Sequence, residues 1–287
     1  MTRRADLGVT LLFVLALLAL TAAIVVAMEV QSDGSITRSQ TYADASSAQA
    51  LIAAGEISAV IALRRDGAVA PEVDHAGEDW AKTGQDEVAI DGGRFSLDIA
   101  DAQGLFNLNN LATEGVLAQQ RLSAIVAALG LPPDLAKRII AAYGTGHTIS
   151  HLSDLSRLAA ATPSDLTTLA QMVTVLPEVS DVNLNAAAPG LIAVLLQNPK
   201  LAAQLDTKRA SAGFLTDRDL QGLGVTLPAG LGLRSNFFAL RVTVQVAGTV
   251  QSTDSLIQRR VGQGPVAAAV IARHSVMAAG SPPPPSP

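Results

Sequence analysis

Apolar residues form an unbroken run near the start of the chain. No charged residue occurs from Leu7 to Met28, and these 22 residues are enough to cross a bilayer core of roughly 30 Å as a helix. Arg3 and Arg4 precede the run, so the positive-inside rule places the N-terminus in the cytoplasm and the rest of the chain outside it. The pattern therefore predicts a membrane-spanning segment over residues 9–28.

An amphipathic stretch continues directly from this run. Isoleucine, leucine and valine recur among alanines and polar residues as far as Arg65, and no proline interrupts residues 1–70. We expect one helix over residues 9–65, with Gly34 and Gly55 as its weak points, because glycine is a poor helix former. Alanines near the end of the apolar run also fit a secretory cleavage site, so a cleaved signal remains an alternative.

Alternation of apolar and polar residues predicts strands on both sides of the middle of the chain. Residues 94–99 alternate, and so do residues 236–251, while residues 255–261 can return as a hairpin partner. Residues 265–276 fit another strand or a short helix. The tail, residues 277–287, is rich in proline and is not expected to pack.

The segment between the predicted strands is rich in alanine and leucine and contains several helix-start signals. Asn-Leu-Asn occurs at residues 107–109 and again at 183–185. Asparagine side chains hold turns and cap helices by bonding nearby backbone groups, and this structural role is favoured over ligand binding. We therefore predict an inserted helical domain, residues 101–232, made of two related units at about 101–180 and 181–232.

These patterns together predict an α+β protein. A long N-terminal helix leads into a small sheet domain made of residues 66–100 and 233–276, which the helical domain interrupts. The chain contains no cysteine, so disulfides and thiolate metal sites are excluded. The formal net charge is −5, and residues 101–200 hold five basic and seven acidic residues, a balance that argues against a nucleic-acid partner.

Catalytic motifs are absent from the sequence: it contains no GxSxG, Walker or HExxH pattern, and no catalytic residue is assigned. His147 and His151 are four residues apart, but glycines beside them argue against a helix, and a surface or turn role is favoured over a metal site. Acidic side chains gather at residues 72–79 and at Asp217 and Asp219. Calcium binds such oxygen ligands, but the spacing is not that of an EF-hand, so calcium stays an option without assigned ligands.

The start of the chain resembles the class III leader of type IV pilins and pseudopilins. A short basic leader ends at Gly8, and the sequence VTLL then opens the apolar run. The resemblance implies that a prepilin peptidase removes residues 1–8 and methylates Val9. Most members carry glutamate as the fifth residue after the cut, whereas this chain has Phe13. The K-type minor pseudopilin of type II secretion systems is the member that lacks this glutamate.

The middle of the chain also resembles the K-type pseudopilins. DAQGLFNLNNL at residues 101–111 is similar to their Asp-x-x-Gly-x-Phe-Asn-Leu-Asn-x-Leu stretch, and VNLNAA at 182–187 is similar to their second Asn-x-Asn motif. SNFFALRVTVQV at 235–246 resembles their returning strand. The motif residues, for which we expect a structural role, are Asp101, Gly104, Phe106, Asn107, Asn109, Asn183 and Asn185.

The resemblance implies assembly rather than enzymatic activity. The expected function is that of a minor pseudopilin at the tip of the type II secretion pseudopilus, which assists export of folded proteins across the outer membrane. Its implied partners are the I-type and J-type minor pseudopilins, the major pseudopilin and the prepilin peptidase. Its implied location is the inner membrane, as a single-pass protein with its C-terminal domain in the periplasm. Two alternatives remain: a minor type IV pilin or DNA-uptake protein with a helical binding head, and a signal-anchored periplasmic protein of another function.

Overall fold

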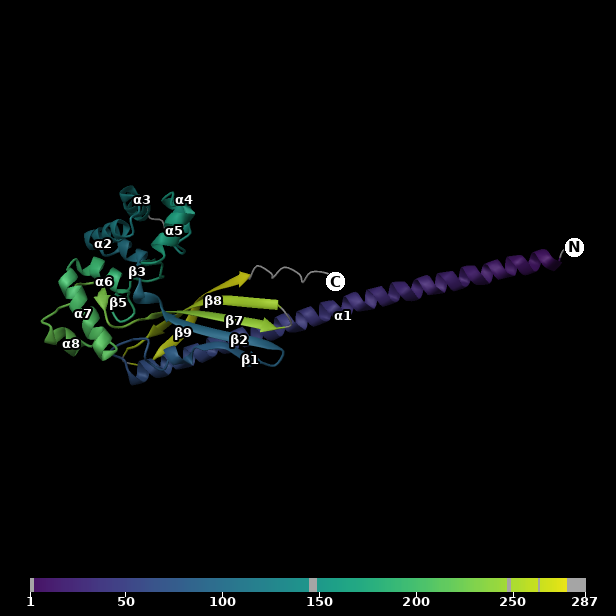
Figure 1. Ribbon diagram of the computed structural model, residues 1–287, viewed down its shortest axis with the longest axis horizontal. Helices are drawn as coiled ribbons and strands as arrows, with labels where there is room; N and C mark the ends of the chain where they lie inside the picture. Colours follow the sequence, from purple (N-terminus) through teal and green to yellow (C-terminus); the bar gives the residue numbers. More distant parts are fainter. Residues whose placement is uncertain (1–2, 145–148, 247–248, 263, 278–287) are drawn as a thin grey trace. The chain divides into compact units, whose positions relative to one another are not determined.

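The computed structural model describes residues 3–144, 149–246, 249–262 and 264–277, and the surroundings of their side chains except at residues 3–13, 29–37 and 276–277. The chain divides into two units, residues 1–51 and 52–287. The helix α1 (Arg3–Val69) contributes to both units (Figure 1).

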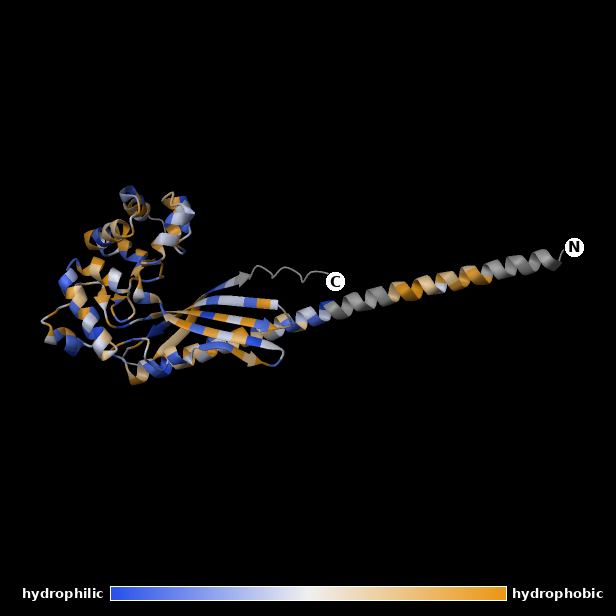
Figure 2. Ribbon diagram, viewed as in Figure 1, coloured by the Kyte–Doolittle hydropathy of each residue, from blue (hydrophilic) through white to orange (hydrophobic). Residues whose placement is uncertain are grey.

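The first unit consists of α1 over its described residues. Its stretch Val14–Met28 is apolar, and large side chains are exposed along it, from 50% for Val14 to 66% for Met28. Figure 2 shows this stretch as a continuous apolar band. A helix that is apolar all round is typical of a protein core or a membrane span, so the exposed band agrees with the predicted membrane segment.

The C-terminal part of α1 belongs to the core of the second unit. The stretch Arg38–Val69 is also long and apolar enough to cross a membrane by length and composition alone. From residue 52 onward, however, it carries the buried carboxylates of Glu56 and Asp66, which pair with arginines of the sheet. Buried carboxylates that are paired in this way indicate that this part of α1 packs within a folded domain.

Both glycines predicted as weak points lie inside the helix, and α1 ends at Val69, beyond the predicted end at residue 65. The structure gives a packing reason for Gly55. An ideal Cβ atom at Gly55 would lie 3.1 Å from Val242 Cγ2 and 3.2 Å from Phe95 Cζ. The absence of a side chain therefore lets the helix approach the sheet closely.

The sheet of the second unit has five antiparallel strands in the order β1-β2-β7-β8-β9. Its strands are β1 (Gln85–Ile90), β2 (Gly93–Asp101), β7 (Phe237–Val246), β8 (Thr249–Arg260) and β9 (Ala267–Met277). The segment predicted as a strand or a short helix is the strand β9. β8 begins at Thr249 rather than at residue 255, and β1 is a strand that the sequence pattern did not predict.

The two faces of the sheet differ in polarity because side chains alternate along each strand. The face toward α1 carries buried apolar residues, including Leu97, Val242 and Val244. The opposite face carries cross-strand rows of other kinds. One row is apolar and mostly small, with Ala100, Ala239, Leu256 and Ala272 paired in turn across β2, β7, β8 and β9. We call this second surface the outer face.

The α-helices that follow α1 lie between β2 and β7 in the sequence, and Figure 1 shows them grouped at one end of the sheet. They are α2 (Gly115–Ala128), α3 (Pro133–Gly144), α4 (Asp154–Leu158), α5 (Pro163–Leu169), α6 (Pro189–Leu196), α7 (Pro199–Ala212) and α8 (Asp217–Gly222). Short 3-10 helices lie at η1 (Ala81–Thr83), η2 (Ala102–Gly104) and η3 (Leu108–Ala112). Leu122, Ile125 and Leu191 are fully buried in the apolar core that these helices share.

Two small parallel strand pairs organise this helical insert. β3 (Phe106–Asn107) pairs with β4 (Val173–Thr174), and β5 (Val182–Asn183) pairs with β6 (Leu231–Gly232). Each pair joins an Asn-Leu-Asn segment to the end of the helices that follow it. The predicted unit boundaries near residues 180 and 232 lie close to the strand pairs.

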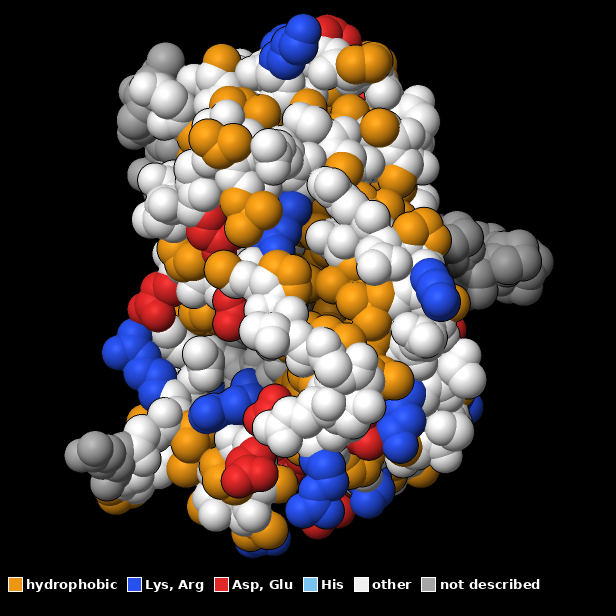
Figure 3. Space-filling view, turned by 90° about the vertical axis from the view of Figure 1, so that its left-hand side faces the viewer, with side chains coloured by type: hydrophobic (Ala, Val, Ile, Leu, Met, Phe, Trp, Pro, Cys, Tyr) orange, Lys and Arg blue, Asp and Glu red, His pale blue; other side chains and the backbone are white. Residues whose placement is uncertain are grey.

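The surface of the insert carries charges of both signs. Figure 3 shows Lys and Arg side chains interspersed with Asp and Glu side chains on the face turned to the viewer, without a continuous basic stripe on that face. A mixed surface of this kind offers no electrostatic track for a phosphate backbone there.

Replacing Gly55 by leucine is expected to lower the free energy of unfolding by about 2 kcal/mol or more, because the new side chain would collide with the sheet. The matched control is Ala54→Leu, on an exposed position of the same helix turn, where the change should stay within about 0.5 kcal/mol. Urea denaturation of the full chain in detergent measures both. Equal effects of the two substitutions would contradict the close approach.

Candidate functional site: the junction of sheet and helical insert

Polar side chains from distant parts of the second unit meet where the insert leaves and rejoins the sheet. Asp101 stands at the end of β2, Ser235 lies just before β7, and Arg259 lies near the end of β8. Asp66 comes from the last turn of α1, and Asn183 comes from β5 of the insert. We call this cluster the junction.

Arg259 is the cationic centre of the junction and is only 2% exposed. Its Nη1 atom donates to Asp66 Oδ2 at 2.9 Å, and its Nη2 atom forms an ion pair with Asp74 and donates to the Ser235 carbonyl at 2.9 Å. The guanidinium carbon lies 4.8 Å from the ring centroid of Phe238. One side chain of β8 thus connects the end of α1, the following loop and the start of β7.

Asp101 and Asn183 connect the insert to the same cluster. Asn183 Nδ2 donates to Asp101 Oδ2 at 2.7 Å and to the Asp74 carbonyl at 3.0 Å. Ser235 Oγ donates to Asp101 Oδ2 at 2.6 Å, while the Ser235 backbone N–H donates to Asp74 Oδ2 at 2.7 Å. Asp101, Asp74 and Ser235 therefore fix both ends of the insert relative to the loop after α1.

Two residues of η2 complete the connection. Gln103 Nε2 donates to the Asp181 carbonyl at 2.8 Å, and Gln103 Oε1 accepts the backbone N–H groups of Asn236 at 2.6 Å and Phe237 at 3.1 Å. Gly104 lies so close to the insert that an ideal Cβ atom would be 2.9 Å from the Ala186 carbonyl oxygen. The backbone of η2 is thus held directly against the second Asn-Leu-Asn segment.

Burial changes the acidity of the junction carboxyls. It raises the pKa of Asp66 to about 6, and the nearby charge of Glu78 adds to this effect. It also raises the pKa of Asp101 to about 6, against the hydrogen bonds from Ser235, Gln103 and Asn183, which favour the charged form. These carboxyls therefore bind a proton more readily in the folded protein than in the unfolded chain.

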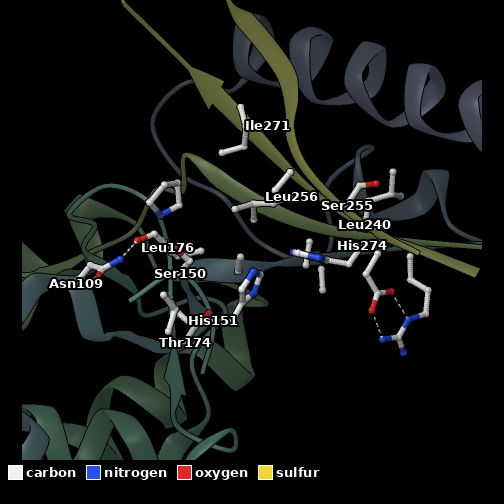
Figure 4. Close-up of a pocket in the computed structure, with 18 of the residues that line it drawn as sticks. Asn109, Ser150, His151, Thr174, Leu176, Leu240, Ser255, Leu256, Ile271 and His274 are labelled. Carbon is white, nitrogen blue, oxygen red and sulfur yellow. Dashed lines mark hydrogen bonds and ion pairs between the residues drawn. The ribbon is translucent and has the colours of Figure 1, made fainter. Parts of the chain in front are cut away.

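The first Asn-Leu-Asn segment organises its own helical unit. Asn107 Oδ1 accepts the backbone N–H of Asn109 at 3.1 Å and that of Leu176 at 3.0 Å. Asn109 Nδ2 donates to the carbonyls of Leu176 at 2.7 Å (Figure 4) and Ile149 at 3.3 Å. Phe106, directly before them, is 1% exposed in the core of the insert. Both amides bond mainly backbone groups, with side-chain contacts to Ser180 and Tyr143, and they hold β3 against the segments around α4 and β4.

The second Asn-Leu-Asn segment repeats this arrangement. Asn183 Oδ1 accepts the backbone N–H of Asn185 at 2.9 Å, as Asn107 does for Asn109. Asn185 exchanges two hydrogen bonds with the backbone of Leu215, at 3.0 Å and 2.7 Å. Leu215 precedes α8 in the second helical unit of the insert, as Ile149 precedes α4 in the first helical unit. In both units the second asparagine thus fixes the backbone before a short helix.

The acidic groups at the junction give little support for a metal site. Carboxylate oxygens of Asp66, Asp74 and Glu78 lie within 4.8 Å of one another, and all three residues are buried. Arg259 already pairs with the first two, while Glu78 Oε2 accepts the N–H groups of Trp80 Nε1 and the His75 backbone, each at 2.9 Å. Protein donors thus serve all three carboxylates, and calcium remains an expectation without assigned ligands.

Other residues singled out from the sequence lie elsewhere. The side chains of Gly8, Val9 and Phe13 are outside the described part of α1, and His147 lies outside the described residues. Asp219 closes a capping box with Thr216 at the start of α8.

Sequence reasoning did not single out Arg259, Asp66 or Ser235 as members of a common cluster. One signal was available in the sequence. Arg259 lies two residues after Ile257 and so shares its strand face, and a charged residue on a buried face needs a partner. Its partners lie 193 and 24 positions away along the chain, so no local spacing connects them.

Comparisons with known proteins agree with this architecture. No protein-family model matches the chain. Its sequence is 27% identical over 255 residues to the type II secretion system protein K of Pseudomonas aeruginosa, and the alignment covers 76% of each protein. Its fold matches a chain in the crystal structure of the GspK–GspI–GspJ complex from enterotoxigenic Escherichia coli, with a TM-score of 0.65 and 20% identity, over 84% of this chain and 100% of that chain.

The predicted resemblance to the K-type pseudopilins and the predicted α+β fold are thereby confirmed. The name of the sequence relative, type II secretion system protein K, agrees with the expectation of an assembly component rather than an enzyme.

Gly104→Ala is expected to lower the free energy of unfolding by about 2 kcal/mol, because its methyl group would press on the backbone of Ala186. Gly222→Ala is the matched control in the same insert: nothing lies within 4 Å of its ideal Cβ atom, and alanine favours a helix, so stability should stay equal or rise slightly. Urea denaturation of the full chain in detergent compares them. A Gly104→Ala protein as stable as the Gly222→Ala protein would contradict the tight junction.

The raised pKa values of Asp66 and Asp101 predict a protein that is more stable at pH 5 than at pH 7. Each carboxyl has a pKa of about 6 when folded and an ordinary value of 3.8, so the folded state binds more protons between these values. The free energy of unfolding therefore falls as the pH rises through 6, by about 1 kcal/mol per carboxyl between pH 5 and pH 7. Thermal denaturation of the full chain at the two pH values measures the change.

Two variants separate the contributions. Asp101→Asn should remove about half of this pH dependence. His75→Gln should steepen it, because burial lowers the pKa of His75 and its contribution has the opposite sign. A wild-type melting temperature that is higher at pH 7 than at pH 5 would show that these carboxyls do not titrate as described.

Proposed function

We propose that this chain is the minor pseudopilin at the tip of a type II secretion pseudopilus, where it assists export of folded proteins across the outer membrane. The observation that carries the proposal is the similarity to protein K over 76% of both sequences, together with a common fold over 84% of this chain. The mechanism is assembly: the apolar helix anchors the subunit, and the sheet and helical insert form its head.

The N-terminal segment supports assembly through a pilin-type route. The basic leader ends at Gly8, and the apolar band Val14–Met28 is exposed along α1. In this proposal a prepilin peptidase cuts between Gly8 and Val9 and methylates Val9. The cut leaves the apolar part of the helix intact. This part then remains in the inner membrane, and the second unit lies in the periplasm.

The identity of residue 13 supports a position at the tip. An unpaired carboxylate in a membrane is costly, so a glutamate at this place needs a cationic partner from a neighbouring subunit. Phe13 carries no such requirement. A subunit with no neighbour on that side is suited to the end of a filament, and a large helical insert fits the same place, because no further subunit has to stack above it.

The partners follow from the solved relative. The matched chain comes from a complex named for GspK, GspI and GspJ, so we propose the I-type and J-type minor pseudopilins as direct partners of this chain. The major pseudopilin would follow them along the filament. The amides of Asn109 and Asn185 are bonded to backbone groups of the insert, which supports a structural role for these motifs.

The test is the mass of the mature N-terminus. Coexpression with a prepilin peptidase is expected to yield a chain that begins at methylated Val9, and Gly8→Arg is the control that should remain uncut. Removal of Arg3, Arg4 and Asp6 with the leader also changes the formal net charge from −5 to −6. A chain that stays intact with the peptidase, or one cut near Ala27, would overturn the pseudopilin proposal, since either lacks the processed helix that enters the filament.

A further inference from the structure

A cavity of about 690 Å³ lies between the outer face of the sheet and the first helical unit. Its floor includes the small side chains of Ala100, Ala239 and Ala272, and its wall includes Ile149 and residues 174–177. Figure 4 shows that residues from the sheet and from the insert line the same space. Its lining also includes His151, Asp254 and His274, which take no part in the junction.

Two histidines from different parts of the fold meet in this cavity. His151 precedes α4 in the insert, and His274 belongs to β9. Their ring centroids are 4.5 Å apart, with an angle of 76° between the ring planes. Figure 4 shows the two rings turned toward each other. Both residues are exposed, so their rings can turn without disturbing the core.

His274 also ends a row of alternating charges on the outer face. Asp98 pairs with Arg241, Arg241 with Asp254, and Asp254 with His274 across four neighbouring strands. Arg241 binds Asp254 through two hydrogen bonds of 2.7 Å and 2.9 Å. The row therefore places a carboxylate beside His274, where it would attract a bound cation.

We propose that His151 and His274 together bind one divalent late transition-metal ion of the Zn²⁺ or Cu²⁺ class. A metal–nitrogen bond of about 2.0–2.1 Å places the centroids of two imidazoles on one ion about 4.5 to 5.2 Å apart, for angles of about 90° to 109° at the metal. The observed separation of 4.5 Å falls in this range. Imidazole nitrogen suits this class of ion, and the cavity leaves room for water at the remaining positions.

The sheet supplies the supporting charge. Asp254 is paired with His274 in the β8–β9 register, where a carboxylate can accept the N–H of a metal-bound imidazole and orient its ring. The ion would join β9 to the insert on the side of the outer face. This inference does not rest on the proposed function, since it uses only residues of the cavity.

The test is titration of Zn²⁺ into the untagged full chain in detergent at pH 7.5, followed by calorimetry. Wild-type protein is expected to bind one ion. His151→Gln and His274→Gln should each weaken binding by about tenfold or more, because each removes half of the protein ligands. His75→Gln is the matched control, because His75 stacks on Phe214 outside this cavity, and its affinity should equal that of the wild type.

A second readout identifies the ligand atoms. With one equivalent of Cu²⁺, the electron paramagnetic resonance spectrum of the wild type is expected to show splitting from two nitrogens, and each of the two cavity variants should lose one of them. The inference is overturned if no Zn²⁺ binds at millimolar concentration, if either cavity variant binds as tightly as the wild type, or if His75→Gln weakens binding equally. Exposure of both histidines means that the glutamine variants are expected to fold.

Discussion

The buried charge of Arg259 is the constraint on which the second unit depends. A guanidinium that is almost fully buried must be paired, because an unpaired charge in a protein interior is very costly. Its partners, Asp66, Asp74 and the Ser235 carbonyl, come from three separate segments of the chain. The charge is satisfied only when the end of α1, the following loop and the start of β7 are all in place. Such a requirement penalises alternative packings of these elements more strongly than apolar contacts do.

The asparagines of the insert solve a related problem with neutral groups. Short two-residue strands and short helices leave many backbone N–H and carbonyl groups without regular partners. The motif asparagines bond such groups, and equivalent asparagines do so in the same way in both helical units of the insert. They are Asn107 and Asn109 in the first helical unit, and Asn183 and Asn185 in the second. The repeated motif is therefore a repeated backbone connection, and the two helical units are built on the same local plan.

Local patterns predicted much of this architecture. Alternation identified β2 and β7, and the recurrence of Asn-Leu-Asn pointed to two helical units, because each signal lies within a few residues of chain. The pattern was ambiguous for β9, whose alanine-rich start suits a helix as well as a strand, and pairing with β8 decides the matter. Arg259 and Asp66 could not be paired from sequence, because their contact depends on how α1 lies against β8. The sequence pattern marks Gly55 as a weak point of the helix. The structure shows instead that this glycine allows the helix to pack closely against the sheet.

The insert leaves and returns at neighbouring positions, since Asp101 at the end of β2 is paired with Phe238 at the start of β7. If residues 102–237 were an unfolded loop, bringing these two strands together would cost about 4 kcal/mol of chain entropy. A folded insert whose ends already lie side by side removes that cost. The large head thus acts toward the sheet as a tight hairpin turn would. Its size and surface are free to change between related chains without altering the pairing of the strands that carry it.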